Sequence, residues 1–482
     1  MAATSASKSA AIRARLNHPV IDSDGHTVEF FPAVLDYLEQ TGGTKVVERF
    51  TAGMGGGFFG GWYRLSPEER RERRATRPLW WALPTKNTLD RATATFPKLL
   101  YERLDEIGID FTVRYPTLGI FPPHLADEEL RRAGCRAFNL FHADLFQEYA
   151  DRMMPVAVIP MHTPQEALEE LEYAVQQSGM RAIMMAGHVW RPIPAIAPTS
   201  PQPARATMWL DTFGLDSAYD YDPVWAKCVE LKVAPTFHSG GMGWGSRRSI
   251  SNYMYNHIGH FAAAGEAVCK ALFMGGVTRR FPTLRCAFLE GGVGWACHLY
   301  ADLIGHWEKR NPQGLENYNP ANLNREQLAD LYWRYGGKLA TERLAHLARR
   351  FGIPPGRPED GVDDWAACHI ARAEDIRDLF IPYFYFGCEA DDPLTAWAFN
   401  TTVNPFGARL QAIFGSDMGH WDVPDMTEVV AEAHELVDKG VLSAEDFRDF
   451  VFTNPVTLWT AMNPDFFKGT VAEGAVEKFL AR

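Results

Sequence analysis

The sequence lacks the features that mark several classes of protein. No apolar run reaches the roughly 18 residues that a membrane-spanning helix needs. None of the seven cysteines form a C-x-x-C pair, and most stand in apolar surroundings. The formal net charge is −12, so no basic surface for a phosphate backbone is expected. We therefore expect a cytoplasmic protein with reduced, buried thiols, and neither a nucleic acid nor a membrane as a partner.

The length and composition are those of a globular protein. With 482 residues, 46% of them hydrophobic and 22% charged, the chain is long enough for one large barrel or for about two to three ordinary domains. Residues 1–17 are small, polar and basic and contain no apolar core of a secretory signal. They predict a disordered tail, followed by a single domain over residues 18–482.

Short apolar segments alternate with helical patterns along most of the chain. Eight segments read as strands, at residues 19–26, 111–115, 154–160, 182–185, 233–238, 284–289, 383–386 and 411–416. Alternation of strand and helix is typical of a parallel sheet. We predict an α/β fold, a TIM-like (β/α)8 barrel with helical and loop insertions near residues 43–98, 192–223 and 308–378.

Polar side chains gather where four of these strands end. The last strand runs into Gly415 and then Asp417. The next helical pattern starts only near Asp425, so a cap of that helix is a weaker interpretation of Asp417 than a site residue. Asp24 and His26 end the first strand, His238 the fifth, and Glu290 the sixth. A barrel places the ends of its strands on one face, so we expect these side chains to meet there.

The spacing of Asp24 and His26 suits two ligands of one metal ion, because residues i and i+2 of a strand point to the same side. A polar turn after an edge strand would explain the same pattern. Together with His238 and Asp417 they form a nitrogen and oxygen set suited to Zn²⁺, Mn²⁺ or Fe²⁺. The absence of thiolates from this set argues against a purely structural zinc site.

Two of the insertions are longer than a solitary barrel needs. Residues 53–84 are rich in glycine and aromatic residues, including Trp80 and Trp81, and residues 308–378 are rich in charge. We expect these segments to be buried between chains of a homo-oligomer, or of a hetero-oligomer with a homologous chain. His257 and His260, three residues apart on an expected helix, fit a helix surface or an interface better than the site.

Several segments resemble the amidohydrolase-related superfamily, in the branch that includes aminocarboxymuconate semialdehyde decarboxylase and the hydroxybenzoate decarboxylases. The matching segments are Ile21–His26, Arg103–Asp110, Thr236–Gly240, Gly276–Leu284 and Gly415–Trp421. They follow the order of the family over nearly the whole chain. The resemblance implies one or two divalent metal ions held by residues such as Asp24, His26, His238 and Asp417.

The chain departs from this family at Glu290, where decarboxylase members normally have a histidine. Glu290 is predicted either as a fifth metal ligand, as a general base, or as a buried acid paired with Arg114 or Arg191. Three carboxylates in one site would suit two divalent ions. The catalytic candidates are therefore Glu290 and Asp417, with His188 after the fourth strand and His420 as further imidazoles. No lysine ends the fourth strand to bridge two metals, unlike some dinuclear relatives.

Three functions fit this resemblance. The first is an enzyme that acts on a small organic, carboxylate-bearing substrate by hydrolysis or non-oxidative decarboxylation. The second is a dinuclear iron or manganese oxygenase, a hydroxylase on the same fold, as some divergent members of the superfamily are. The third is a metal-bearing, non-catalytic partner subunit of a homologous enzyme.

Overall fold

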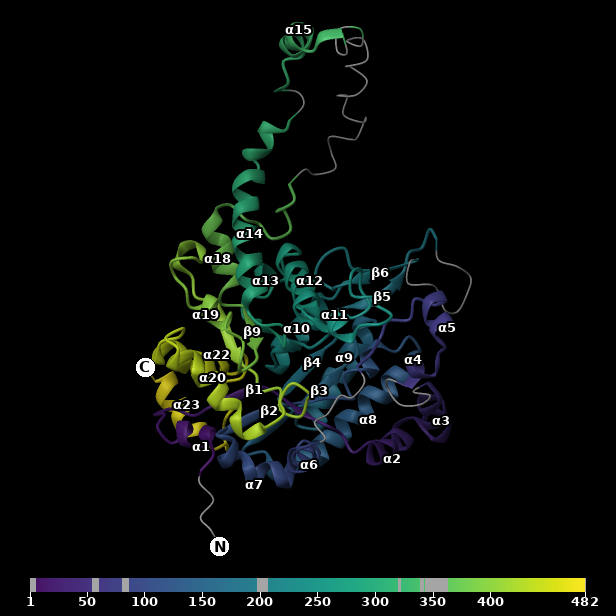
Figure 1. Cartoon of the computed structure of the whole chain (residues 1–482), viewed down its shortest axis with the longest axis vertical. Helices are drawn as coiled ribbons and strands as arrows, with labels where there is room; N and C mark the ends of the chain where they lie inside the picture. Colours follow the sequence, from purple (N-terminus) through teal and green to yellow (C-terminus); the bar gives the residue numbers. More distant parts are fainter. Residues whose placement is uncertain are drawn as a thin grey trace.

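The computed structural model describes residues 6–53, 60–79, 86–196, 207–319, 322–338, 342 and 363–481. Eight parallel strands form a nearly closed barrel with helices around it, which confirms the predicted fold class (Figure 1). The strands are β1 (Ile21–Thr27), β2 (Phe111–Pro116), β3 (Met153–Ile159), β4 (Ala182–Met185), β7 (Pro235–Phe237), β8 (Cys286–Phe288), β9 (Phe384–Cys388) and β10 (Gln411–Phe414). They follow one another in that order around the sheet.

Hydrogen bonds near the carboxyl ends of β1 and β10 join the two edges of this sheet. The amide of Asp417 donates to the carbonyl of Asp24 over 2.9 Å, and the amide of His26 donates to the carbonyl of Met418 over 3.1 Å. Residues almost 400 positions apart in the sequence are thus direct neighbours. Closure at this end places the polar residues of the first and last strands side by side.

Helices lie between successive strands and cover the barrel from outside. The principal ones are α7 (Pro97–Ile107), α8 (Glu128–Phe146), α9 (Pro164–Glu172), α10 (Asp222–Leu231), α12 (His260–Met274), α14 (Gly294–Arg310), α18 (Ala373–Phe380), α20 (Val429–Asp438) and α22 (Asn454–Met462). Shorter helices between and after them are α11 (Tyr253–His257), α13 (Val277–Arg280), α19 (Thr395–Ala398), α21 (Ala444–Arg448) and α23 (Glu473–Leu480). Because helices cover one face of the strands and side chains fill the other, β1, β2 and β3 are buried along their whole length.

The N-terminal segment corrects one expectation, because it is not a disordered tail over its described part. Residues Lys8–Arg13 form helix α1, whose first turn is capped by the hydroxyl of Ser7. The buried hydroxyl of Ser9 accepts hydrogen bonds from the amides of Val430 and Ala431, at the start of α20. A short polar segment therefore folds because it supplies a cap to a distant helix, which its own sequence does not reveal.

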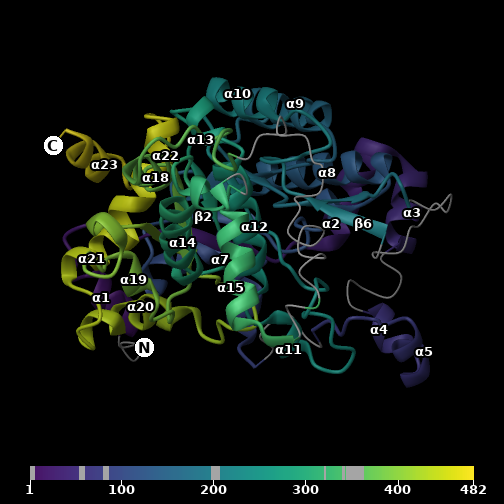
Figure 2. The same ribbon diagram turned by 90° about the horizontal axis from the view of Figure 1, so that it is seen from above.

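The first insertion is more helical than its glycine content indicates. Helix α2 (Phe31–Gly42) precedes it, and it contains α3 (Thr44–Gly53), α4 (Gly60–Arg64), α5 (Pro67–Glu72) and α6 (Thr88–Thr93). Helices α2, α3 and α8 share a small apolar core of their own, which includes Val34, Val46 and Phe138. Helices α4 and α5 lie at the edge of the molecule far from the C-terminus (Figure 2). Trp80 and Trp81 lie outside the described residues.

The second insertion was expected as a loop, but it contains one strand of a hairpin, whose other strand precedes it. Strands β5 (Val189–Pro192) and β6 (Met208–Asp211) pair antiparallel and are separate from the barrel sheet. Part of the third insertion forms an arm. Helix α14 leads away from the barrel, and α15 (Arg325–Tyr335) lies at the far end with no buried residue (Figure 1).

Two expectations about composition can be compared with the described residues. All seven cysteines are buried and unpaired. Among the described helices, none is long and apolar enough to cross a membrane. The predicted division of the chain into an N-terminal tail and a single domain stays a prediction.

Candidate metal centre

The first strand of the barrel supplies two candidate ligands, Asp24 and His26, from a tightly packed segment. The pairing of β1 with β2 is irregular between Asp22 and Gly25, just where Asp24 lies. A Cβ on Gly25 would lie 2.4 Å from Oδ2 of Asp22 and 2.5 Å from Nη1 of Arg114, so no side chain fits there. Glycine at this position lets the strand pass the buried arginine and still present Asp24 and His26 to the centre of the barrel.

Asp24, His26 and His238 meet there, and we call them the histidine group. Nε2 of His26 lies 3.1 Å from Nε2 of His238, and Oδ1 of Asp24 lies 3.5 Å and 3.7 Å from these two nitrogens. Ligands about 2.0–2.2 Å from one ion at tetrahedral angles are about 3.3–3.6 Å apart. The separations of the three atoms, 3.1–3.7 Å, are close to those of ligands around a single ion.

The orientation of His26 is fixed from behind. Its Nδ1 lies 3.3 Å from the carbonyl oxygen of Pro116, to which it donates when Nε2 is left free. A second hydrogen bond of this kind is what commonly orients a metal-binding imidazole. The side chain of His26 is completely buried, so this geometry is held by the surrounding barrel.

Glu290 and Asp417 approach the same point from the ends of β8 and β10. Oε2 of Glu290 lies 3.1 Å from Nε2 of His238, and Oδ1 of Asp417 lies 3.4 Å from Nε2 of His26. Both residues adopt left-handed backbone conformations, with φ of 54° and 48°. Such conformations are unfavourable for residues other than glycine and are enriched at functional sites. The predicted five-residue ligand set thus lies together, and its binding of metal stays a prediction.

The two other catalytic candidates have different positions. Nδ1 of His420 lies 2.6 Å from Oδ1 of Asp417, its Nε2 lies 3.1 Å from the hydroxyl of Thr117, and its ring is 3.9 Å from that of His26. His188 packs against Trp244 and His124, with ring centroids 4.8 Å and 5.1 Å away. His420 therefore joins the centre, whereas His188 belongs to none of the metal-binding groups among the described residues.

Sequence reasoning missed two acids of the centre. Glu290 and Asp417 form a second cluster with Glu389 and Asp422, which we call the carboxylate group, with one oxygen of each side chain within 4.8 Å of the others. Glu389 directly follows β9, so it stands at a strand end like the residues that the sequence did single out. Its position at the end of a strand could therefore have identified Glu389 as a candidate. Asp422 lies in a turn whose direction the sequence does not reveal.

A buried network holds the two edges of the barrel in place beneath these ligands. Asp22 accepts hydrogen bonds from the hydroxyl of Thr112 at 2.6 Å and from the amide and hydroxyl of Ser416, both at 2.9 Å. It also accepts from the amide of Asp24 at 3.2 Å. Arg114 donates to the carbonyl of His26. This network fixes the backbone on either side of Asp24 and Asp417.

Burial dominates the electrostatics of the centre. It raises the pKa of Asp24 well above its usual value, helped by the charge of Asp22, and it raises the pKa of Glu389 to about 8. Burial also lowers the pKa of His238 to about 3 and that of His26 well below its usual value. The imidazoles are thus neutral, as metal ligands must be, and the carboxylates need a cation nearby to ionise readily.

The third alternative for Glu290, a buried acid paired with Arg114 or Arg191, is wrong. Among the described residues, Nε2 of His238 and of His26 lie 3.1 Å and 3.9 Å from its carboxylate, and it forms no ion pair with an arginine or a lysine. Arg191 instead pairs with Asp211 and donates to the hydroxyl of Tyr221. Arg191 and Asp211 lie on the two strands of the β5–β6 hairpin, so their pairing depends on a contact that the position of Arg191 after the fourth strand does not indicate.

Comparison with known proteins identifies the family. A sequence profile of amidohydrolases matches residues 64–312, more than half of the chain. The chain belongs to the amidohydrolase family. It is an enzyme of the metal-dependent hydrolase or carboxy-lyase class, as the sequence resemblance implied.

Solved structures resemble this amidohydrolase over almost its full length. An amidohydrolase from Mycobacterium avium subsp. paratuberculosis has a TM-score of 0.51 and 17% identity, over 92% of this chain and 100% of that one. The 2,6-dihydroxybenzoate decarboxylase from Rhizobium has a TM-score of 0.46 and 14% identity, over 92% and 99%. A manganese-bound dihydroxybenzoic acid decarboxylase from Polaromonas has a TM-score of 0.47 and 15% identity, over 94% and 99%. The first of these shows the shared fold.

Aromatic side chains pack beside the centre of this amidohydrolase. Phe261 stacks edge-on against His238 at 5.2 Å, and His260 lies 4.0 Å from Phe261. His257 packs against Trp421 at 5.6 Å. His257 and His260 therefore lie beside the centre, although their spacing on a helix favoured a surface position.

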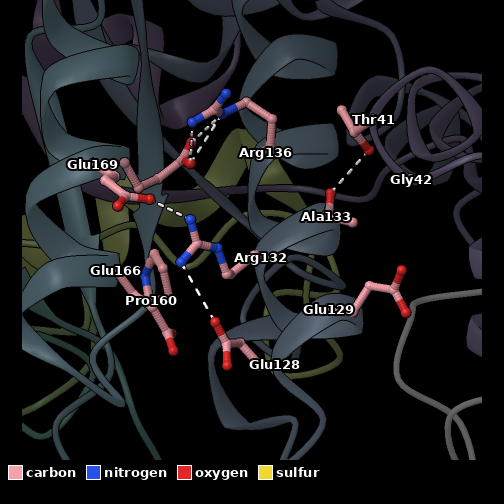
Figure 3. A pocket seen from close by; sticks show the side chains of 11 residues that line it. Thr41, Gly42, Glu128, Glu129, Arg132, Ala133, Arg136, Pro160, Glu166 and Glu169 are labelled. Carbon is pink, nitrogen blue, oxygen red and sulfur yellow. Dashed lines mark hydrogen bonds and ion pairs between the residues drawn. The ribbon is translucent and has the colours of Figure 1, made fainter.

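A separate cleft opens between α8 and α9, and it shares no residue with the centre (Figure 3). Most of its charged side chains form ion pairs, some of them with arginines outside the cleft. Arg132 contacts Glu128 and Glu169, and Arg136 contacts Glu170. These contacts join the two helices, so the cleft is explained by packing of the barrel wall.

Proposed function

We propose that this amidohydrolase is a hydrolase of a small organic substrate that depends on one divalent cation held by the histidine group, with Glu290 and Asp417 beside it. The observation that carries the proposal is the meeting of five atoms. The two Nε2 atoms of His26 and His238 lie 3.1 Å apart, and one oxygen each of Asp24, Glu290 and Asp417 lies within 3.1–3.9 Å of at least one of them. A divalent ion in such a set lowers the pKa of bound water toward about 7 and polarises a carbonyl.

Glu290 is the residue that receives the proton of the attacking water in this proposal. Its Oε2 accepts no hydrogen bond among the described residues, although its side chain is only 4% exposed. The neighbouring cation favours the ionised carboxylate, which is the form that can act as a base. Asp417 and His420 form the adjacent pair that passes a proton to the leaving group, because their closest atoms are 2.6 Å apart.

The charge of the centre favours hydrolysis over decarboxylation of an anionic substrate. Asp24, Glu290 and Asp417 already exceed the charge of one divalent ion, and Glu389 and Asp422 add to it. A carboxylate-bearing substrate would approach this set against like charge. Water and a neutral ester or amide meet no such repulsion.

Activation of dioxygen is a second candidate, which the carboxylate group favours. Oxygen-rich ligand sets suit iron and manganese, whereas zinc accepts nitrogen and sulfur readily. Hydrolysis of activated esters and amides, release of carbon dioxide and uptake of oxygen are separate assays that distinguish the three reactions.

Metal content tests the ligand assignment directly. His238→Ala removes one imidazole, so the metal content of the purified protein should fall by at least about 10-fold. His298→Ala is the matched control, because that side chain is 78% exposed and lies on α14. An unchanged metal content in His238→Ala would reject the histidine group as the site.

Glu290→Gln tests the base. The amide keeps the size of the side chain and removes its ability to accept a proton, so turnover should fall by about 10²–10⁴-fold while the ion in the histidine group is retained. A variant with wild-type metal content and wild-type turnover would show that Glu290 has no catalytic role.

A further inference from the structure

A partly buried tyrosine stands beside the metal centre and is not used by the proposed hydrolysis. Tyr253 lies on α11, in the long connection between β7 and α12. Its ring centroid is 5.1 Å from that of His257 and 6.4 Å from that of Trp421. His257 in turn lies 6.1 Å from Phe261, the ring that packs against His238. Tyr253 is therefore connected to the centre through its neighbours on two sides.

The segment that carries Tyr253 is held in place by buried hydrogen bonds. The side chain of Asn256 lies on the same helix and is completely buried. Its oxygen accepts from the amide of Ser249 at 2.7 Å, and its nitrogen donates to the carbonyls of Ser249 and Arg77 at 2.9 Å and 3.1 Å. The amide of Arg77 donates to the carbonyl of Ser249 at 2.9 Å. These bonds tie α11 to the first insertion and give the ring of Tyr253 a fixed place.

The hydroxyl of Tyr253 faces the centre. Burial raises the pKa of this phenol, and the charges of Asp422, Glu290 and Asp417 raise it further. These acids follow two different strands and come together in the carboxylate group, so a phenol on which all three act is directed there. The indole N–H of Trp421 donates to the phenol oxygen. The ring contacts and the surrounding charges thus agree on where the hydroxyl lies.

The proton of this hydroxyl is not taken up by the acids that it faces. Oε2 of Glu290, both oxygens of Asp417 and Oδ1 of Asp422 accept no hydrogen bond within the described part of the chain. A phenol has an ordinary pKa of about 10, so at neutral pH it keeps its proton and is a donor. Since the indole of Trp421 donates to the oxygen of Tyr253, the proton of Tyr253 is directed to a group that enters the centre.

Hydrolysis of a neutral ester or amide needs such a donor. The oxygen of water forms a bond to the carbonyl carbon, its proton passes to Glu290, and the π electrons move onto the carbonyl oxygen. The acids that surround this oxygen, Asp417 and Asp422 among them, repel its new negative charge. A fixed, uncharged donor in a site that excludes water offsets this repulsion most in the transition state.

We propose that Tyr253 is a catalytic residue whose hydroxyl donates a hydrogen bond to the carbonyl oxygen of the substrate as that oxygen becomes negative. The proposal rests on the proposed function, because it concerns the same hydrolysis at the same centre. Tyr253 keeps its proton throughout. When the carbonyl forms again, the bond to the leaving group breaks, and the leaving atom takes the electron pair and a proton from the pair of Asp417 and His420.

Two acetyl compounds with different leaving groups test this role. Nitrophenyl acetate releases a nitrophenolate that needs no proton, whereas nitroacetanilide releases an amine that must be protonated. Both compounds develop the same negative oxygen. Tyr253→Phe removes only the hydroxyl, so kcat should fall by about 10²–10³-fold on both compounds, while KM and metal content stay within about 2-fold of the wild type.

Binding of nitrophenyl methylphosphonate gives a second readout that needs no turnover. Its anionic oxygens mimic the charged state of the carbonyl oxygen, and such mimics bind more tightly than substrates. Calorimetry should show binding to Tyr253→Phe that is weaker by at least about 10-fold. Tyr255→Phe is the matched control, because that tyrosine lies on the same helix and is 55% exposed, so its kcat and its binding should equal those of the wild type.

A second variant keeps the test available if thermal melts show that Tyr253→Phe is unfolded. Trp421→Phe removes the indole N–H that polarises the phenol, and its side chain is 38% exposed, so the fold does not depend on it. Its kcat should fall by about 2–10-fold on both compounds, which is the contribution of one neutral hydrogen bond.

The outcomes separate this assignment from the proposed function. Equal losses of kcat on the two compounds support it. A loss on the anilide alone would show that Tyr253 protonates the leaving group, and unchanged kcat or unchanged phosphonate binding would show that it does not contact the charged oxygen. Each of these results overturns the assignment and leaves the hydrolysis standing. If the metal-loaded wild type hydrolyses neither compound, the proposed function fails, and the assignment of Tyr253 fails with it.

Discussion

Replacement of Asp22 should destabilise the barrel more than its small size indicates. This carboxylate is completely buried and accepts four hydrogen bonds, from Asp24, Thr112 and twice from Ser416. It ties β1 to β2 and to the segment after β10, so it acts where the barrel closes. Asp22→Ala leaves two backbone amides and two hydroxyls without this partner.

The magnitude follows from those contacts. Hydrogen bonds to a charged group contribute about 1.5–3 kcal/mol each, but relaxation and entry of water recover part of the loss. Removal of one partner of a buried charge costs about 3–5 kcal/mol, and Arg114 beneath Asp22 would lose one of its two neighbouring carboxylates. We expect a loss of about 3–5 kcal/mol in the free energy of unfolding for Asp22→Ala.

Asp22→Asn should fall between the wild type and the alanine variant. The amide keeps the shape and its oxygen still accepts from the amides of Asp24 and Ser416, while its NH₂ group turns to the two hydroxyls, which can accept instead. The charge opposite Arg114 is lost, so we expect a loss of about 1–3 kcal/mol.

Urea denaturation followed by circular dichroism measures these differences. Asp105→Ala is the control, because that side chain is 88% exposed and its ion pair with Arg152 should contribute under about 1 kcal/mol. If Asp22→Ala unfolds within about 0.5 kcal/mol of the wild type, the network does not hold the barrel closed and the account of how Asp24 and Asp417 are positioned fails.

Two further predictions concern other parts of the molecule. Burial raises the pKa of Glu29 from 4.5 to about 7, so unfolding releases a proton between these values. The contribution of Glu29 to the free energy of unfolding is fully present below pH 4.5 and is lost as the pH rises to 7. Relative to Glu29→Gln, the wild type should lose about 3 kcal/mol over this range. Parallel pH profiles of the free energy of unfolding for the two proteins would contradict this. The arm should associate with another chain, because Trp333 and Tyr335 on α15 are 64% and 80% exposed. Light scattering at micromolar concentration should show a dimer or larger, which Trp333→Ser weakens and Trp397→Ser on α19 does not, and a monomeric wild type would refute it.

The sequence by itself determined the local elements and the order of the barrel. Thr163 before Pro164 predicts the start of a helix, and its hydroxyl does accept a hydrogen bond from the amide of Glu166 at the start of α9. Such signals depend on neighbours in the chain, so they can be read without a fold. The strand ends carrying Asp24, His238, Glu290 and Asp417 were recognisable for the same reason.

Only the tertiary structure decided the partners of those residues. The side chain of Glu166 accepts two hydrogen bonds from Arg131 of the neighbouring helix α8. Glu290 is paired with His26 and His238 rather than with an arginine, and Glu389 joins it because β8 and β9 are adjacent in the barrel. These contacts bring together residues that are 35 to 264 positions apart, at separations of a few ångströms that depend on how the helices and strands pack. Local sequence specifies where a strand ends, but the direction of each side chain at that end is set by the packing of the whole barrel.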